Sequence, residues 1–332
     1  MGAAILLVIS FAIILAGALV FTNAVEWLGH RLEVGEGATG SILAAVGTAM
    51  PETLIPIVAI IGGSEGSEDV AIGAIIGAPF LLATLAMALV GTSAFIFQKR
   101  RKQGLALKAD IETLDRDLIF FLSFFGAGLL AGVVLPDVLH IPLAVVFFIA
   151  YMVYVRATLR AGGEVEQADQ IGRLFMDRGD DDQPPTQLIV IQLAVGLAAI
   201  VGGAHLFVEE MIHVAESLGV EALVLSLILA PLATELPEKI NSFFWTREGK
   251  DSLALGNITG AMVFQSTIPV AFGLALTGWE LDRFAVVSAG LGLAGGALAY
   301  VTLRTRGRFE LLPVVSWATL FGAFLAYVLA TS

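Results

Sequence analysis

The stretch GTAMPE at residues 47–52 recurs later in the chain as ATELPE at residues 233–238. Each copy lies inside a long apolar run and places a proline directly before a glutamate. Proline removes a backbone donor and clashes with the preceding turn, so we expect irregular backbone at Pro51 and Pro237. At membrane depth such backbone is tolerated only where it is buried in protein or lines a cavity.

Two further pairs of segments repeat in the same order. IGAIIGA at 72–78 corresponds to LGNITGA at 255–261, and GALVF at 17–21 corresponds to GAHLF at 203–207. Three matched segments indicate a duplication of five spans. Because five is odd, the second copy enters the membrane from the opposite side, which is the inverted architecture of secondary transporters with a substrate site near the midplane.

The composition is that of an integral membrane protein. Of the 332 residues, 57% are hydrophobic and 14% are charged, whereas soluble domains carry about a quarter charged residues. Runs of about 20 apolar residues, enough to span a bilayer, are expected at 3–23, 38–62, 69–97, 117–136, 140–158, 187–209, 219–245, 252–277, 283–303 and 310–330. The predicted fold is an all-α membrane protein of ten transmembrane helices in two inverted five-helix repeats.

Basic residues predict the orientation, because cytoplasmic loops are rich in lysine and arginine. With ten spans nearly all of them fall on one side, and only Arg283 lies on the other. We therefore expect both termini outside the cell membrane. The net charge of −12 does not suggest nucleic-acid binding, and the absence of cysteine excludes disulfides and thiolate metal sites.

The predicted organisation is a first repeat over 1–160, a cytoplasmic acidic linker over 161–186 and a second repeat over 187–332. The linker is either a calcium sensor or a solvated, flexible connection. It has no EF-hand spacing, which favours the flexible connection.

Glu52 and Glu238 are ionisable groups inside the bilayer, where a charge costs at least about 2.5 kcal/mol and marks a functional site by default. Thr48 and Thr234 each lie four residues earlier, on the same helix face as their glutamate. Carboxylate, hydroxyl and carbonyl oxygens together form a cage for hard cations such as Ca²⁺ and Na⁺. A zinc site needs histidine or cysteine instead.

Glu235 adds a third carboxylate one turn from Glu238. Three carboxylates together need a counter-charge. Lys239, four residues after Glu235, either pairs with it or extends to the cytoplasmic end of the helix.

These segments resemble the calcium/cation antiporter superfamily, especially its sodium/calcium exchanger branch. The typical family repeats read GTSLPE followed by GNxxGSN, and the resemblance covers nearly the whole chain. It implies that Glu52 and Glu238 bind Ca²⁺ and, in turn, Na⁺, together with Thr48 and Thr234. It also implies ligation by backbone carbonyls three residues before each threonine, which are those of Ala45 and Pro231.

The chain departs from the family pattern at several neutral ligand positions. Asn257 keeps the asparagine of the second Gly-rich segment, and the replaced positions hold Ala49, Ala74, Ala78, Leu82, Glu235, Ala261 and Gln265. The charge for a divalent ion remains, but fewer oxygens are available for sodium. Proton coupling becomes plausible, since a glutamate in a low-dielectric environment resists ionisation.

The sequence therefore predicts an antiporter, not an enzyme, that exports Ca²⁺ or a similar divalent cation in exchange for Na⁺ by alternating access. Spans one and six are expected to slide against the core, with close approach at Gly17, Gly202 and Gly203. Alternatives are a Ca²⁺/H⁺ exchanger, a channel, or an ion-binding membrane protein without coupled transport. No cofactor is expected besides the transported cations, and the only other partner expected is the lipid bilayer.

Overall fold

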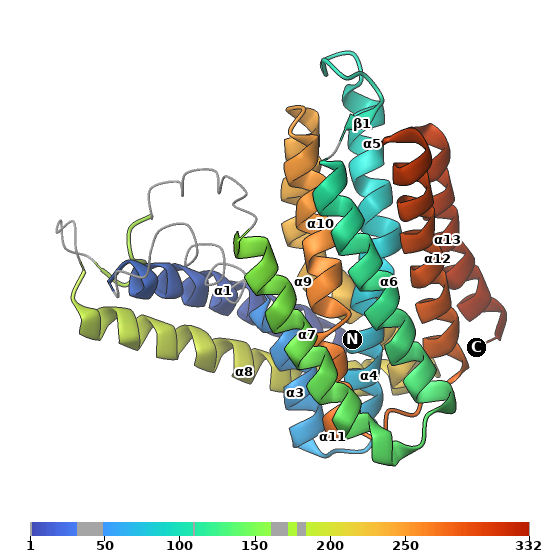
Figure 1. Ribbon diagram of the computed structural model, residues 1–332. Coiled ribbons are helices and arrows are strands. Elements are labelled where there is room, and N and C mark those ends of the chain that lie inside the picture. The colour runs from blue at the N-terminus through green and yellow to red at the C-terminus, as the bar shows by residue number, and fades with distance from the viewer. Residues whose placement is uncertain (1, 32–48, 109, 161–171, 178–183, 332) are drawn as a thin grey trace.

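The computed structural model describes residues 2–31, 49–108, 110–160, 172–177 and 184–331, which form a helical bundle with one projecting helix pair (Figure 1). The elements follow in this order: α1 (Gly2–Arg31), α3 (Met50–Gly62), α4 (Ser67–Leu81), the π-helical turn η1 (Leu82–Ala86), α5 (Met87–Phe97), β1 (Leu107–Lys108), α6 (Ile111–Val134), the 3₁₀ turn η2 (Asp137–Leu139), α7 (His140–Arg160), α8 (Thr186–Leu218), α9 (Ala222–Arg247), α10 (Asp251–Gln265), α11 (Ile268–Leu276), α12 (Arg283–Arg306), β2 (Arg308–Phe309) and α13 (Leu311–Thr331).

The helices are those of an integral membrane protein. Eight helical segments in the described residues are long and apolar enough to cross a bilayer. Two shorter apolar helical stretches, α3 (Met50–Gly62) and the Ala222–Glu235 part of α9, lie in the predicted second and seventh spans. Residues 38–48 of the predicted second span lie outside the described residues, so the count of ten stays a prediction.

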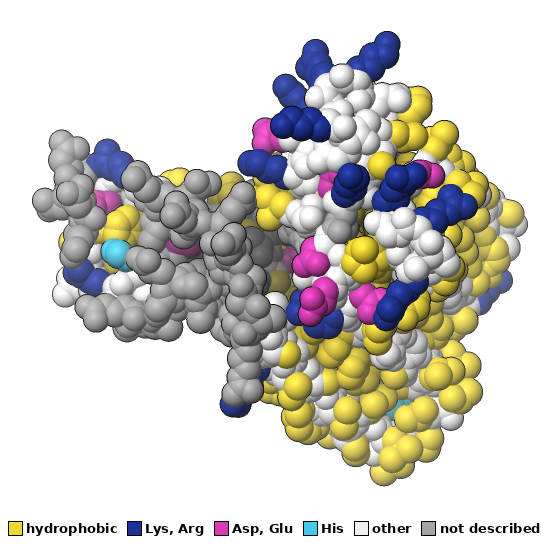
Figure 2. All heavy atoms as spheres, turned by 45° about the horizontal axis from the view of Figure 1, so that its top comes forward, with side chains coloured by type: hydrophobic (Ala, Val, Ile, Leu, Met, Phe, Trp, Pro, Cys, Tyr) yellow, Lys and Arg dark blue, Asp and Glu magenta, His cyan; other side chains and the backbone are white. Residues whose placement is uncertain are grey.

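The surface of the bundle suits contact with lipid tails. Figure 2 shows hydrophobic side chains over its lower part, whereas lysine and arginine gather towards the opposite end. On α7, for example, Ile141, Phe148 and Val153 are all exposed. Large exposed apolar surfaces are rare on soluble monomers and are expected where lipid replaces water.

Contacts between loops place three basic segments at one end of the bundle. β1 pairs antiparallel with β2, with Leu107 opposite Phe309 and Lys108 opposite Arg308. This strand pair joins the loop after α5 to the loop after α12. An ion pair between Arg101 and Asp251 joins the α5 loop to the start of α10. The predicted common side for these loops is confirmed, while its assignment to the cytoplasm stays a prediction.

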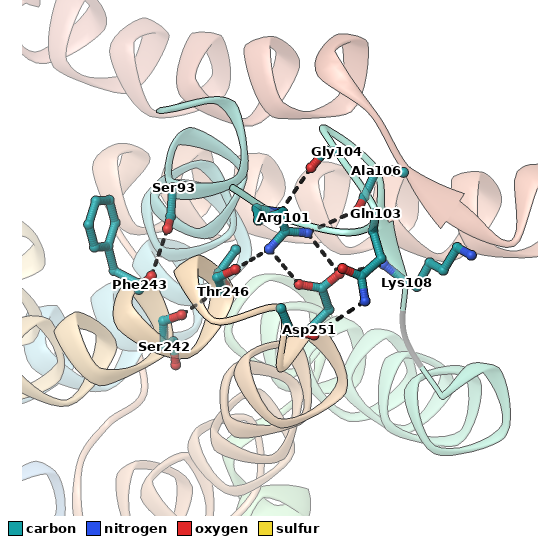
Figure 3. A network of polar contacts seen from close by, with 11 residues as sticks. Ser93, Arg101, Gln103, Gly104, Ala106, Lys108, Ser242, Phe243, Thr246 and Asp251 are labelled. Carbon is teal, nitrogen blue, oxygen red and sulfur yellow. Dashed lines mark hydrogen bonds and ion pairs between the residues drawn. The ribbon is translucent and has the colours of Figure 1, made fainter. Parts of the chain in front are cut away.

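A buried ion pair holds this end together (Figure 3). The Arg101 guanidinium contacts both carboxylate oxygens of Asp251, at 2.7 and 2.9 Å. It also donates to the backbone oxygens of Ala106, at 3.0 Å, and Thr246. The backbone N–H of Lys108 donates to Asp251 at 3.0 Å. Because the bidentate pair is satisfied on both sides, its charges are tolerated in the protein interior.

The projecting pair of helices, α1 and α8, packs through small residues (Figure 1). A Cβ at Gly17 would lie 3.0 Å from the Ile200 backbone nitrogen, and one at Gly203 would lie 3.2 Å from that of Ile14. The close approach expected at Gly17 and Gly203 is confirmed. The expectation for Gly202 is wrong, because a Cβ there meets no described atom within 4 Å.

Gly196 is the contact that the sequence analysis missed. A Cβ at this position would lie 2.7 Å from the backbone nitrogen of Phe21. It lies seven residues, about two helical turns, before Gly203 and so on the same face of α8.

Part of the acidic linker is anchored. The backbone N–H of Phe175 donates to the side-chain oxygen of Asn23 on α1 at 3.2 Å. The N–H of Met176 donates to that of Gln192 on α8 at 2.8 Å. The expectation of a flexible connection is wrong for residues 172–177, because they bond to buried amides of both helices. Residues 161–171 and 178–183 of the linker lie outside the described residues.

We predict that Gly196→Ala destabilises the α1–α8 pair by about 1–3 kcal/mol, the usual cost of overpacking, because the new methyl group meets the Phe21 backbone. Gly202→Ala is the matched control in the same helix. Thermal unfolding in detergent should show a lower midpoint for Gly196→Ala and an unchanged or higher one for Gly202→Ala. Equal midpoints for the two variants would contradict this packing.

We also predict that Asp251→Asn costs about 3–5 kcal/mol, because it leaves the Arg101 charge buried without its partner. Glu310→Gln removes an exposed ion pair to Arg308, of 2.8 Å, and should cost at most about 1 kcal/mol. The same unfolding assay compares the two variants. A loss at Asp251 no larger than that at Glu310 would show that the buried pair does not hold this end together.

Candidate ion-binding site

The site begins with the close packing of α4 on α9. A Cβ at Gly73 would lie 2.6 Å from the carbonyl oxygen of Leu223, and one at Gly77 would overlap that of Leu227. A Cβ at Gly77 would also lie 2.8 Å from the ring of Pro231. The first Gly-rich segment therefore lets α4 lie directly against the α9 backbone.

A small cavity of about 10 Å³ lies beside this contact, lined by residues of α3, α4 and α9: Glu52, Ile55, Pro56, Ala74, Ala78, Ala230, Pro231 and Thr234. Its volume is close to the space that a single water molecule needs. Glu52, Thr234 and Pro231, all predicted site residues, are brought together here. Among the lining side chains only those of Glu52 and Thr234 carry polar atoms.

Glu52 is a buried carboxylate in the first turn of α3, with 7% of the residue exposed. Its helix begins at Met50, and Pro51 occupies a first-turn position where its missing N–H is not needed. The positive end of the helix dipole therefore lies close to the carboxylate and stabilises its charge.

Thr234 lines the same cavity and carries a hydroxyl group. The hydroxyl donates its hydrogen to the carbonyl oxygen of Ala230 at 3.2 Å. A hydroxyl has one hydrogen and two lone pairs, so donation to the backbone leaves the oxygen to accept a hydrogen bond or contact a cation.

Both carboxylate oxygens of Glu235 have partners within the protein. Lys239 places its ammonium nitrogen 3.5 Å from Glu235 Oε2, and Gln265 donates its side-chain amide to Oε1 at 2.8 Å. The side chains of Lys239 and Glu235 are 1% and 2% exposed. Pairing of Lys239 with Glu235 is therefore confirmed, and the alternative in which it reaches the helix end is wrong.

The irregular backbone predicted at Pro237 is absent, and the helix break near the site lies elsewhere in the second half. α9 continues as a helix through Pro237, since a membrane-embedded proline can be accommodated by its surroundings. α10 instead ends at Gln265, and the chain turns through Ser266 and Thr267 before α11. In the first half, the π-helical turn η1 starts at Leu82, the position that corresponds to Gln265.

Several predicted site residues cannot be placed. Thr48 and Ala45 lie outside the described residues, and Glu238 is described only by its helical backbone in α9. Asn257 is directed elsewhere, because its amide donates to the Ser242 hydroxyl at 3.0 Å. Within the described ranges, no group of three histidine or acidic side chains could hold a metal ion.

A further buried carboxylate was not predicted from the sequence. Asp117 on α6 accepts from Tyr154 on α7 at 2.7 Å and from Thr259 on α10 at 2.8 Å, and Arg116 lies 3.2 Å away. Thr259 belongs to the second Gly-rich segment, so this network ties that segment to α6 and α7. An acidic residue within an apolar span was the available signal.

Comparison with known proteins places this arrangement in a family. The model of the sodium/calcium exchanger protein family matches residues 2–160 and 188–331. The sodium/calcium exchanger MaX1 of Methanosarcina acetivorans is 25% identical over 339 residues, which cover 84% of this chain and 93% of MaX1. A relative from Alkalimonas amylolytica that is named as an antiporter, CaxA, is 27% identical over 144 residues, which are 45% of its own length.

The fold is also that of a solved exchanger. The crystal structure of the H⁺/Ca²⁺ exchanger CAX superposes with a TM-score of 0.72 at 19% identity, over 98% of this chain and 82% of CAX. Since the family model covers nearly the whole chain, including both segments that contribute to the cavity, the protein belongs to the sodium/calcium exchanger protein family.

Proposed function

We propose that this protein is a secondary active antiporter that exports Ca²⁺, or a similar divalent cation, in exchange for monovalent cations at the cavity between α3, α4 and α9. The observation that carries the proposal is the position of Glu52. The buried Glu52 lines a cavity of about 10 Å³ together with Thr234. A buried carboxylate that lines a cavity inside the membrane is a suitable ligand for a cation.

The proposed ligands come from both halves of the chain. Glu52 and Glu238 supply the charge, and the Thr234 hydroxyl supplies a neutral oxygen. Thr48 and the carbonyls of Ala45 and Pro231 complete the proposed oxygen shell, in keeping with the preference of Ca²⁺ for six to eight oxygen ligands.

Reciprocal contacts support an inverted repeat over 1–160 and 187–332. Gly17 approaches Ile200, and Gly203 approaches Ile14. Gly203 lies 186 positions after Gly17, and Ile200 lies 186 positions after Ile14, the same offset that relates Glu238 to Glu52. Such exchange of partners is what a two-fold axis between α1 and α8 produces. It favours ten spans with both termini on the same side of the membrane, and the distribution of lysine and arginine favours the outside for that side.

Alternating access follows from the charge of the empty site. Uncompensated carboxylates resist moving through the apolar interior, whereas the cation-loaded site is neutralised and can change access. The α1–α8 pair, packed backbone to backbone at its glycines, is proposed to slide against the bundle as one unit.

The identity of the coupling ion is proposed from the lining of the cavity. Membership of the family favours Na⁺ as the coupling ion, and MaX1 is named a sodium/calcium exchanger. H⁺ coupling is favoured by the lining itself, because Ala74 and Ala78 offer no side-chain oxygen. Protons need only the carboxylates, whereas sodium needs additional neutral ligands.

We predict that purified protein in liposomes takes up ⁴⁵Ca²⁺ when an outward gradient of Na⁺ or H⁺ is imposed. Glu52→Gln and Glu238→Gln should each lower the initial rate at least about tenfold, because each removes a charge that the divalent ion requires. Glu209→Gln is the matched control, since Glu209 is an exposed glutamate on α8 that contacts His205.

Separate Na⁺, K⁺ and H⁺ gradients identify the counter-ion. Wild-type uptake rates in the Glu52 or Glu238 variants would refute the proposed site. Conductance without obligatory exchange would indicate a channel, and no flux under any gradient would indicate an ion-binding protein without transport.

A further inference from the structure

We propose that the Lys239 ammonium is a resident cation of the ion site, and that it lowers the number of monovalent ions needed to replace one Ca²⁺ from three to two. This inference rests on the proposed function and concerns its stoichiometry. It assigns Glu235 to the lysine and not to the transported ion.

The geometry shows how Glu235 is occupied. Its Oε2 lies 3.5 Å from the Lys239 nitrogen, and its Oε1 accepts the Gln265 amide at 2.8 Å. Gln265 is the last residue of α10 and is 2% exposed. The carboxylate is thus bound by one charged and one neutral donor from two different helices.

The lysine is held inside the protein. Lys239 lies eight residues before the end of α9 at Arg247, which corresponds to about 12 Å along the helix axis. Its side chain is 1% exposed. A lysine normally extends its ammonium group to water. Here the whole side chain is buried beside a carboxylate, which indicates that its positive charge compensates negative charge in the interior.

The pair is close enough to the cavity to set its charge. Glu235 follows Thr234, which lines the cavity, and Lys239 lies five residues beyond Thr234 on the same helix. This is about 7.5 Å along the axis, a distance at which charges in the protein interior still interact strongly.

The charge balance gives the stoichiometry. With Glu238 as the proposed second ligand, Glu52, Glu235 and Glu238 bring three negative charges to the site, and Lys239 brings one positive charge. The empty site therefore carries a net charge of −2. One Ca²⁺ or two monovalent cations neutralise it equally, so exchange is electroneutral. Without the lysine the site would carry a net charge of −3, and Ca²⁺ alone would leave it charged.

The test measures ⁴⁵Ca²⁺ binding to purified protein for the wild type, Lys239→Met, Glu235→Gln and the double variant. Removing the positive charge should tighten Ca²⁺ binding at least about tenfold, and removing the negative charge should weaken it by a similar factor. The double variant keeps the net charge and should bind Ca²⁺ within about threefold of the wild type.

A purely structural role for the pair predicts a different pattern. Lys239→Met would then weaken Ca²⁺ binding or leave it unchanged, and the double variant would not recover the wild-type affinity; either result overturns the inference. Because Lys239→Met leaves a buried carboxylate uncompensated and can prevent folding, the double variant carries the test if the single variant is lost. Replacement of a complete buried ion pair by neutral groups is usually tolerated.

A second readout is the response of transport to membrane voltage. Exchange by the wild type and by the double variant should be insensitive to an imposed potential, and exchange by Lys239→Met should depend on it. Voltage-dependent wild-type exchange overturns the inference and leaves the antiporter intact. Intact Ca²⁺ binding without gradient-driven flux contradicts the proposed function alone, and absence of saturable Ca²⁺ binding by the wild type overturns both.

Discussion

Every carboxylate buried in the apolar interior of this protein needs its charge compensated, and this requirement shapes the packing around it. Glu52, Glu235, Asp117 and Asp251 are all buried carboxylates. Asp251 is compensated by Arg101, Glu235 by Lys239 and Gln265, and Asp117 by Arg116 with two hydroxyl groups. A carboxylate left without such support would cost far more than the packing around it returns. Glu52 lines a cavity, where a transported ion can contribute to compensating its charge.

Glycine and alanine bring the helices close enough to form that cavity. Gly73 and Gly77 allow α4 to contact the α9 backbone, and Ala74 and Ala78 then line the cavity without filling it. Larger side chains at these positions would separate the helices and move Thr234 away from Glu52. The same device joins α1 to α8 at Gly17, Gly196 and Gly203, so helix association in this protein relies on close backbone contact.

Much of this arrangement could be predicted from the sequence. The membrane helices follow from the runs of apolar residues, and the family and the meeting of Glu52 with Thr234 follow from the repeated proline-glutamate motif within them. Other features depend on tertiary contacts. Only the structure decides that Lys239 turns towards Glu235, that Gly196 and not Gly202 meets α1, and that the helix breaks after Gln265 and not at Pro237. Residues 172–177 read as a solvated linker because their hydrogen-bond partners, Asn23 and Gln192, are distant in sequence.

The decisive measurement is a structure determined with Ca²⁺ or the heavier Sr²⁺ bound. We expect one ion in the cavity between α3 and α9, within about 2.3–2.6 Å of oxygen atoms of Glu52 and Glu238. Lys239 should remain beside Glu235 in that structure. An ion bound elsewhere, or one that takes Glu235 as a ligand and displaces Lys239, would contradict this expectation.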